Sequence, residues 1–441
     1  MKKLTTLALA AGLIVAAAAP ASAVDTKVDG QYLFSFARND YSFDKNANAD
    51  TEFAQQRIRL GLTFTASENL AGYVQFQSVD TWGTKHNAIA DTGVRQLYID
   101  WMVPSTPVKV RLGKIQCGLP AHAFGQSMMM GPGNNRYAVV ASAPVADWMD
   151  VTAMWTRQAI AQQQTEGTWD NPETGEFLDD VTSGSNDAFA LTANVKLDGL
   201  TITPTVMYAV DSRTDTTFAV ETPKTNNKSQ TIWGEVTANL TMFDPLNVKA
   251  TVGTAYTDKE KADDVKGWYG MALASYKMSF GTPVFGFWYG SGAEENEAIA
   301  TTRLSAFGGG KVAQGIAFTD NSYGLDSGVI AGCSINGTWG LKLGVNGLSF
   351  LEGLTHDVAV LMYKGTNHDS TVSGDLYVKG ATNLAWTDTV YEFDLSNTYQ
   401  IYKNLAANLQ LAYILNDVNE DLHKDYEDDG WRAALTFQYK F

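Results

Sequence analysis

The chain has 441 residues and a formal net charge of −16, and 45% of its residues are hydrophobic. So acidic a protein is a poor partner for nucleic acid, and its two cysteines are too few for a disulfide scaffold. A helical enzyme of this length would show sustained 3.6-residue periodicity, whereas the pattern that recurs here has a period of two.

The first 23 residues have the features of a secretory signal peptide. Two lysines precede an apolar run, and the sequence ASA at 21–23 forms a small-residue cleavage site. A transmembrane helix is the alternative, but the run is short and Pro20 interrupts its end. We therefore predict export and a single-domain mature chain of residues 24–441, whose formal charge is −18 once the two lysines are removed.

Apolar and polar residues alternate along the mature chain. In residues 57–66, RIRLGLTFTA, the arginines fall on one face of a strand and the aliphatic residues on the other, because successive side chains point to opposite sides. The same pattern occurs in residues 108–113, 189–197, 391–401 and 405–415.

Short and long connections take turns between these segments. The short ones are at 67–69, 104–106, 144–146, 198–199, 244–246, 281–283 and 403–404. The long polar ones are at 39–52, 82–91, 159–186, 212–228, 258–266, 291–322, 367–385 and 417–429. A β-sandwich has no reason for this rhythm, whereas a transmembrane barrel has short periplasmic turns and long outer loops.

This rhythm predicts an all-β, antiparallel transmembrane barrel of about 18 strands, or 16 if one hairpin is discarded. The strands start near residues 27, 53, 70, 92, 107, 136, 148, 187, 200, 230, 247, 267, 283, 324, 355, 387, 405 and 430. The weakest are 136–143 and the region 324–350, and Pro204 contradicts its strand because proline lacks a backbone donor.

Tryptophan and tyrosine gather near the ends of the predicted strands. They are Trp101, Trp148, Trp233, Trp268, Tyr269, Trp386, Tyr399, Tyr402, Trp431 and Tyr439. Bilayer interfaces favour such amphipathic rings, although ordinary packing in a soluble barrel is the alternative.

The last eleven residues, WRAALTFQYKF, alternate most strictly. One face carries Ala433, Leu435, Phe437, Tyr439 and Phe441, and the other carries Arg432, Ala434, Thr436, Gln438 and Lys440. Together with the signal peptide and the barrel rhythm, this ending resembles the bacterial outer-membrane general porins, a family of homotrimers. The resemblance covers the whole mature chain.

The resemblance implies a function and a set of partners. In that family the terminal strand is the signal read by the barrel-assembly machinery, which assigns Leu435, Phe437, Tyr439 and Phe441 to barrel insertion. It implies a homotrimer in the cell outer membrane, among lipid and lipopolysaccharide, that uses no cofactor. It also implies a channel for passive diffusion of small hydrophilic solutes and ions, and no enzymatic activity.

A further long loop, which is not polar, joins the fifth and sixth predicted strands at residues 117–135. It is the third long loop along the chain, and it is expected to fold into the barrel, as the third loop does in general porins. Residues 117–135 are apolar and rich in Gly and Met, unlike the acidic loops around them, which suits packing against the inner wall. The constriction residues predicted in and after this loop are His122, Met128, Met129, Met130 and Arg136. Without a Cys or His at ligand spacing, the methionines favour packing over a soft metal site.

The wall facing this loop is predicted to be basic. The cations assigned to the constriction are Arg57, Arg59, Lys109 and Arg111, with Arg38 at the top of the first strand. General porins often place carboxylates on the loop opposite such arginines, and this loop has none.

No acidic residue lies between Asp100 and Asp147, so we expect no local neutralisation of this basic patch. Confined cations concentrate anions, which predicts an anion preference. Glu235, Glu392 and Asp394 on later strands would act against it by restoring a transverse field.

Several alternatives stay open at this level. Cys117 and Cys333 are candidates for a disulfide in an oxidising periplasm. A channel specific for sugar or phosphate is the closest rival function. A barrel enzyme is a weaker one, because none of the five histidines lies beside a G-x-S-x-G motif. A plugged structural barrel conflicts with 16–18 strands, which leave a water channel.

Overall fold

The computed structural model describes residues 24–40, 50–83, 93–125, 135–160, 181–212, 214–216, 228–260, 263–295, 315–317, 335–372, 377–378, 381–423 and 429–441. The main sheet is a closed antiparallel barrel of 18 strands, which decides between the two predicted strand numbers. Within the described ranges, no helix is long and apolar enough to cross a membrane.

Each strand of the barrel pairs with the next barrel strand along the chain. In order they are β1 (Asp25–Asp40), β2 (Asp50–Ser67), β3 (Leu70–Thr81), β4 (Gly93–Met102), β5 (Lys109–Gln116), β6 (Asn135–Ala146), β7 (Met149–Ile160), β9 (Ser185–Leu197), β10 (Leu200–Asp211), β12 (Ser229–Phe243), β13 (Leu246–Lys259), β14 (Val265–Tyr276), β15 (Thr282–Gly290), β16 (Thr338–Leu351), β17 (Leu354–Gly365), β20 (Thr389–Tyr402), β21 (Leu405–Asp417) and β22 (Gly430–Lys440).

Small elements occupy some of the long connections. They are the hairpin-like pairs β8 (Val181–Ser183) with β11 (Thr214–Thr216) and β18 (Tyr377–Val378) with β19 (Ala381–Thr382), and the 3-10 turn η2 (Asp369–Thr371). Tight turns join the strands at one end of the barrel and the longer connections join them at the other. We call these the short-turn end and the long-loop end.

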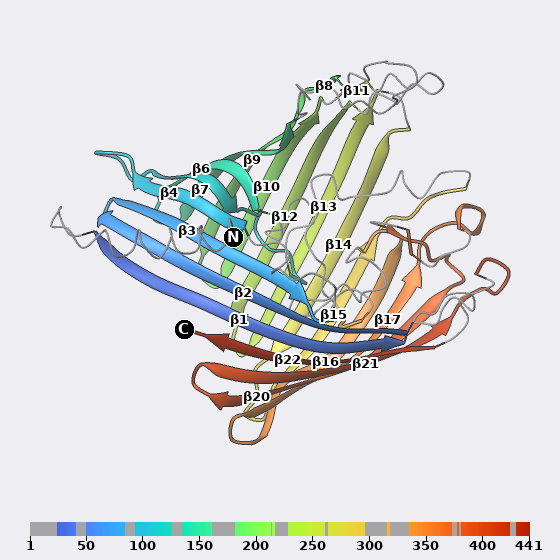
Figure 1. The fold of residues 1–441 in the computed structure, drawn as a ribbon. Helices are drawn as coiled ribbons and strands as arrows, with labels where there is room; N and C mark the ends of the chain where they lie inside the picture. Colours follow the sequence, from blue (N-terminus) through green and yellow to red (C-terminus); the bar gives the residue numbers. More distant parts are fainter. Residues whose placement is uncertain are drawn as a thin grey trace, which may run out of the picture.

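Closure of the barrel joins the two ends of the chain. β1 pairs with β2 on one side and with β22 on the other, and Figure 1 shows the ribbons of β1 and β22 side by side. Beyond the last ladder pair, Phe441 and Gly30 exchange two backbone hydrogen bonds, of 3.0 and 3.2 Å. The Phe441 ring covers Gly30, where any Cβ would clash with it. The terminal residue is therefore part of the wall.

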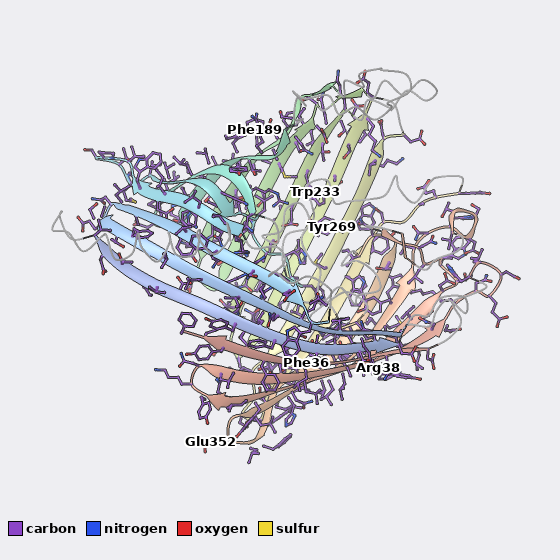
Figure 2. All side chains as sticks on the ribbon, viewed as in Figure 1. Phe36, Arg38, Phe189, Trp233, Tyr269 and Glu352 are labelled. Carbon is purple, nitrogen blue, oxygen red and sulfur yellow. The ribbon has the colours of Figure 1, made fainter. Side chains whose placement is uncertain are left out.

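The two faces of each strand meet different surroundings. On β12, Ile232 and Val236 are 63% and 41% exposed, whereas Trp233 and Glu235 are 0% and 4% exposed. Figure 2 shows Phe189 at the outer margin of the barrel and Trp233 and Tyr269 within it. The outer face is thus apolar, and the other set of side chains lines the interior.

The aromatic residues divide between the two faces. Trp148, Trp268, Tyr399 and Tyr402 are exposed near strand ends, as predicted for an interfacial belt. The assignment of Trp233 and Tyr269 to that belt is wrong, because their register places both among the interior residues, where their rings pack at 6.1 Å. Proximity to a strand end does not reveal which face a ring occupies.

The terminal strand has the two faces that its sequence predicts. Arg432, Ala434 and Thr436 are buried inside the barrel, at 1%, 2% and 4% exposure. Tyr439 and Phe441 stand on the outer face and stack with Tyr32 of β1, with ring centroids 6.0 and 5.7 Å apart. The outer-face aromatics therefore reinforce the seam that closes the barrel. Leu435 and Phe437 share that face.

Seventeen of the 18 predicted strands begin within three residues of the observed ones. The exception is β16, which was expected from residue 324 and begins at Thr338. Residues 336–337 form a turn in which Gly337 has a φ of 76°, so the strand direction is set only after it. Residues 324–334 lie outside the described part of the chain.

Pro204 is accommodated inside β10. The register with β12 pairs Pro204 with Val236, whereas the register with β9 omits residues 203 and 204. The missing donor therefore falls on the β9 side, and the ladder resumes at Thr205 opposite Thr192.

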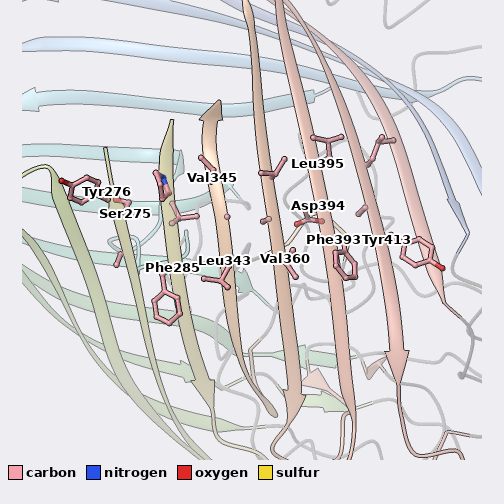
Figure 3. Close-up of a pocket in the computed structure, with 18 of the residues that line it drawn as sticks. Ser275, Tyr276, Phe285, Leu343, Val345, Val360, Phe393, Asp394, Leu395 and Tyr413 are labelled. Atoms are coloured by element: carbon pink, nitrogen blue, oxygen red, sulfur yellow. The ribbon is translucent and has the colours of Figure 1, made fainter. Parts of the chain in front are cut away.

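A shallow apolar groove crosses the outer face of β14 to β21, with a volume of about 900 Å³ (Figure 3). Two rows of outward side chains border it, represented by Phe285, Leu343 and Phe393 in one row and by Val345 and Leu395 in the other. Its composition matches that of the rest of the outer face.

The seam predicts how the barrel depends on its last residue. Deleting Phe441, or replacing it with Asp, removes the ring over Gly30 and the contacts with Tyr32, so folded barrel should fall severalfold. The measurement is heat-modifiable migration of membrane-inserted protein. Lys440→Gln is the matched control, because Lys440 is exposed on the other face. Normal yields of both Phe441 variants would contradict the prediction.

Candidate functional site

The third long loop enters the barrel interior, as expected. Its described residues, 117–125, leave β5 and reach the far wall, where the Ala123 backbone N–H donates to Thr251 Oγ1 of β13 at 3.1 Å. The Phe124 ring meets Trp288 of β15 edge-on at 5.8 Å. This ring also fills the space over Gly286, where a Cβ would lie 2.5 Å from it. Met128, Met129 and Met130 lie outside the described residues.

His122 stabilises the described part of this loop from within. Its side chain has no exposed surface, and its Nδ1 accepts a hydrogen bond from the Phe124 N–H at 3.0 Å, which requires a neutral ring. Burial, with repulsion from Lys249 as the smaller cause, lowers the pKa of His122 to about 3. Near neutral pH, His122 therefore adds packing to the site and no charge.

Arg136 and Cys117 lie at the base of the same loop. They are 3% and 5% exposed, and the guanidinium interacts with the thiol. The thiol of Cys117 is free and lies 4.0 Å from Thr156 Oγ1, so the disulfide considered with Cys333 is not formed in this structure. Cys333 itself lies outside the described residues. Arg136 is thus enclosed by the loop and does not line open water.

A second segment, residues 315–317, also reaches the interior. The backbone N–H of Ile316 donates to Asp394 Oδ2 at 3.0 Å, and that of Ala317 donates to Glu392 Oε1 at 2.6 Å. Tyr363 donates its hydroxyl to the other oxygen of Glu392 at 2.9 Å. These two carboxylates, which were expected to act across the lumen, instead bind a loop to the wall.

Glu235 also contacts another group of the protein. It faces the interior from β12, is 4% exposed, and accepts a hydrogen bond from the Tyr269 hydroxyl. The Tyr269 hydroxyl orients this carboxylate without cancelling its charge. Glu235, Glu392 and Asp394 thus all contact groups of the protein, and the transverse field expected from them stays a prediction.

A cluster of arginines and glutamines lines the inner wall over β1 to β4. Arg57 Nη2 donates to Gln31 Oε1 at 3.3 Å, and Arg59 Nε donates to Gln77 Oε1 at 2.7 Å. Glutamine orients a guanidinium without cancelling its charge. We call this set, with Arg95, the arginine cluster; its charges are close enough to repel one another.

Arg95 is the member of the arginine cluster that the sequence pattern missed. Strict alternation groups Arg95 with Leu97 and Ile99, which face outward. A bulge in the β3–β4 pairing leaves Arg95 without a register partner on β3 and turns its side chain inward. Arg95 is 8% exposed and donates to Gln75 Oε1 at 2.7 Å. The nearby Gly93 and the loop before it were the only sequence hint that this strand begins irregularly.

Lys109 and Arg111 lie on the same wall, and their charges are partly neutralised. Arg111 forms a two-point ion pair with Asp100, with distances of 2.6 and 2.7 Å, and Lys109 Nζ lies 3.3 Å from the same carboxylate. The expectation that no acid neutralises this patch is therefore wrong. Asp100 bounds the acid-free stretch in sequence, and antiparallel pairing brings it directly opposite Arg111.

Two tyrosines connect this ion-paired group with the arginine cluster. The rings of Tyr73 and Tyr98 lie 5.2 Å apart, and the Arg111 guanidinium stacks over Tyr98 at 4.2 Å. Asp29 of β1 is close enough to both rings to act on them electrostatically. The wall of β1 to β5 thus combines cations, glutamine amides and aromatic rings in one continuous surface.

Arg38 belongs to the other face. It pairs with Glu52 at 3.0 Å and lies 5.9 Å from the Trp431 ring, near the long-loop end. Its register partners and alternation place it with the outward residues of β1, such as Phe36. The prediction that Arg38 joins the inner basic wall is therefore wrong.

The fold is similar to those of several Pseudomonas aeruginosa proteins. The outer membrane protein OprD has a TM-score of 0.56 and 13% identity, with 96% of this chain and 95% of that chain covered. OccK9 (OpdG) gives 0.57 and 12%, with 95% and 99% covered. OpdK, in a crystal structure with vanillate, gives 0.54 and 10%, with 95% and 98% covered. At these identities the likeness shows the fold. No family model and no curated protein matches the chain.

The contacts of the third loop predict its dependence on Phe124. Phe124→Ala removes the edge-to-face pair with Trp288 and leaves a cavity over Gly286, changes that together destabilise by about 3–5 kcal/mol at buried sites. Amide hydrogen exchange of Ala123 should then accelerate by at least tenfold. Gln116→Ala, at an exposed position before the loop, is the control. Unchanged protection in Phe124→Ala would show that other contacts hold the loop.

Proposed function

We propose that the protein is an outer-membrane channel for passive diffusion of small hydrophilic solutes and ions, with a preference for anions. The observation that carries the proposal is the arginine cluster on the inner wall of a closed 18-stranded barrel. Barrels of 16–18 strands enclose an aqueous passage, and confined cations raise the local concentration of anions.

The outer surface supports an outer-membrane location. Its outward side chains are apolar in mid-strand, and exposed aromatics such as Trp148 and Trp268 stand at the two ends. The signal peptide of residues 1–23, cleavage before Val24, and insertion by the barrel-assembly machinery through Leu435, Phe437, Tyr439 and Phe441 belong to the same proposal. The short-turn end then faces the periplasm, and the long-loop end meets lipopolysaccharide.

Specificity for a class of solute is the alternative function, and the residues of the interior support it. Arg57 and Arg95 are largely enclosed, and Tyr73 and Tyr98 offer ring faces beside them. A narrow surface of fixed donors and rings discriminates between solutes better than a wide water-filled pore does. OpdK, which has a similar fold, was crystallised with vanillate, an aromatic carboxylate.

An enzymatic function receives no support from the histidine best placed for it. His423 Nε2 lies 2.9 Å from Asp388 Oδ2, the geometry of a base with its orienting carboxylate. Both side chains are 0% exposed, and Asp388 also accepts the backbone N–H groups of Ala385 and Asn419. The pair therefore fastens two long connections together, and we propose that the protein is not an enzyme.

The arginine cluster yields a test of ion preference. Replacing Arg57, Arg59 and Arg95 together with Gln removes three interior cations and leaves shorter polar side chains in their place. The anion-to-cation permeability ratio should fall severalfold, measured as reversal potential under a KCl gradient across a planar bilayer. Arg38→Gln is the matched control, because Arg38 lies on the outer face.

Two results would count against this assignment. A wild-type channel that strongly prefers cations, with a ratio that the triple variant leaves unchanged, would place selectivity in other groups. An equal shift in Arg38→Gln would show that charge anywhere on the barrel sets the ratio. High salt should reduce the effect of the triple variant, because screening shortens the reach of the cluster.

We further propose that the protein assembles as a homotrimer. The support is the resemblance to general porins together with small outward residues on β3, where Gly72 has open space in place of a side chain and Ser78 shares its face. Small residues allow two barrels to approach closely. Native mass measurement in mild detergent should give three chains; a stable single chain would refute the trimer and leave the channel proposal intact.

A further inference from the structure

A cavity of about 510 Å³ lies between the third loop and the inner wall, to one side of the arginine cluster. Residues 115–120 of β5 and the loop bound it on one side, and β6, β7 and β9 bound it on the other. Its volume lies in the range of small-molecule sites. The residues that line it belong to the described part of the chain.

The wall of this cavity, which we call the loop pocket, consists of two neighbouring rows of side chains. Val140, Met154 and Ala190 are register partners on β6, β7 and β9 and form an apolar row. Two residues further along the strands, Ser142, Thr152 and Thr192 form a parallel row of hydroxyls. Ile115 of β5 and Leu119 of the loop also line the cavity, and they are 2% and 9% exposed.

One end of the loop pocket is cationic. Lys109 and Arg111 line it from β5 and share the single carboxylate of Asp100, so this group of three carries one net positive charge. The Lys109 side chain is 50% exposed and can turn toward a ligand. A ligand that fits must therefore place a single negative charge beside Lys109 and an apolar body along Val140 and Ala190.

We infer that the loop pocket binds small monoanions with an aliphatic body, of which hexanoate is a representative. Burial between the apolar row and the loop favours each added methylene, and the hydroxyl row accommodates the second carboxylate oxygen or its water. The pocket lies beside the passage and not across the arginine cluster. Binding there would push the loop away from the wall. This inference rests on the proposed channel only where it predicts that binding changes the current.

The first test measures binding to the purified full chain in detergent by isothermal titration calorimetry. The probes are acetate, butyrate and hexanoate at one pH and ionic strength. Affinity should rise about fourfold per buried methylene, so hexanoate should bind far more tightly than acetate. Equal affinities of the three probes would overturn the inference.

Variants separate the loop pocket from binding elsewhere, including the detergent. Ala190→Leu fills the apolar row and should abolish the dependence on chain length. Lys109→Gln should weaken all three anions by a similar factor. Lys196→Gln is the matched control, because Lys196 is paired with Asp150 and does not line the cavity. Retention of the chain-length dependence in Ala190→Leu would refute the site, provided heat-modifiable migration shows that the variant is folded.

Single-channel recording distinguishes failure of the pocket from failure of the channel. If both proposals hold, hexanoate reduces the current at concentrations that saturate the calorimetric site, and Ala190→Leu is not blocked. Chain-length-dependent binding without any conductance would refute the channel and leave the pocket standing. Conductance that hexanoate never alters, without calorimetric binding, would refute the pocket alone.

Discussion

The architecture depends on the ladder that joins β1 to β22. A sheet that meets lipid has no tolerated free edge, since unpaired N–H and C=O groups would face hydrocarbon. The seam meets this constraint along its ladder and adds the backbone pair between Phe441 and Gly30. Once the ring of strands is closed, alternation decides which side chains meet the outside and which enclose the interior, except at bulges such as the one at Arg95. The glycine is required at the seam because the terminal ring covers it.

Closing the barrel leaves many polar side chains on the inner wall, and these need hydrogen-bond partners. Inward-folded segments supply partners for polar groups on the wall. Thr251 accepts an N–H of the third loop, while Glu392 and Asp394 accept those of Ala317 and Ile316. These contacts use hydroxyls and carboxylates that would otherwise be free to act on solutes. Structural demand therefore decides which interior charges remain available.

The sequence predicted the features that period two controls and missed those that depend on irregular pairing or on segments meeting across the interior. The barrel and the faces of Arg57 and Arg59 follow from alternation, and the rhythm of short and long connections gave 18 strands with 16 as the alternative. Arg95 changes face through one bulge, which no pattern of period two can express. The pairing of Asp100 with Arg111 requires the register of β4 with β5, and alternation leaves register undetermined. β16 was misplaced because a turn, not a polar stretch, precedes it.

The electrostatic asymmetry of the interior follows from where its charged side chains lie and which groups they contact. On the β1–β4 wall, Arg59 and Arg95 donate to glutamine oxygens, so their positive charge is oriented and retained. Elsewhere on the inner wall, Glu235 and Glu392 accept hydrogen bonds from tyrosine hydroxyls, and Glu392 also accepts one from a loop N–H. The short-turn end of the basic wall carries its own acid, Asp100, which holds Arg111 and Lys109. An anion moving along this wall would therefore meet a stronger positive field at the arginine cluster than beside Asp100, because charges within the screening length of about 8–10 Å dominate.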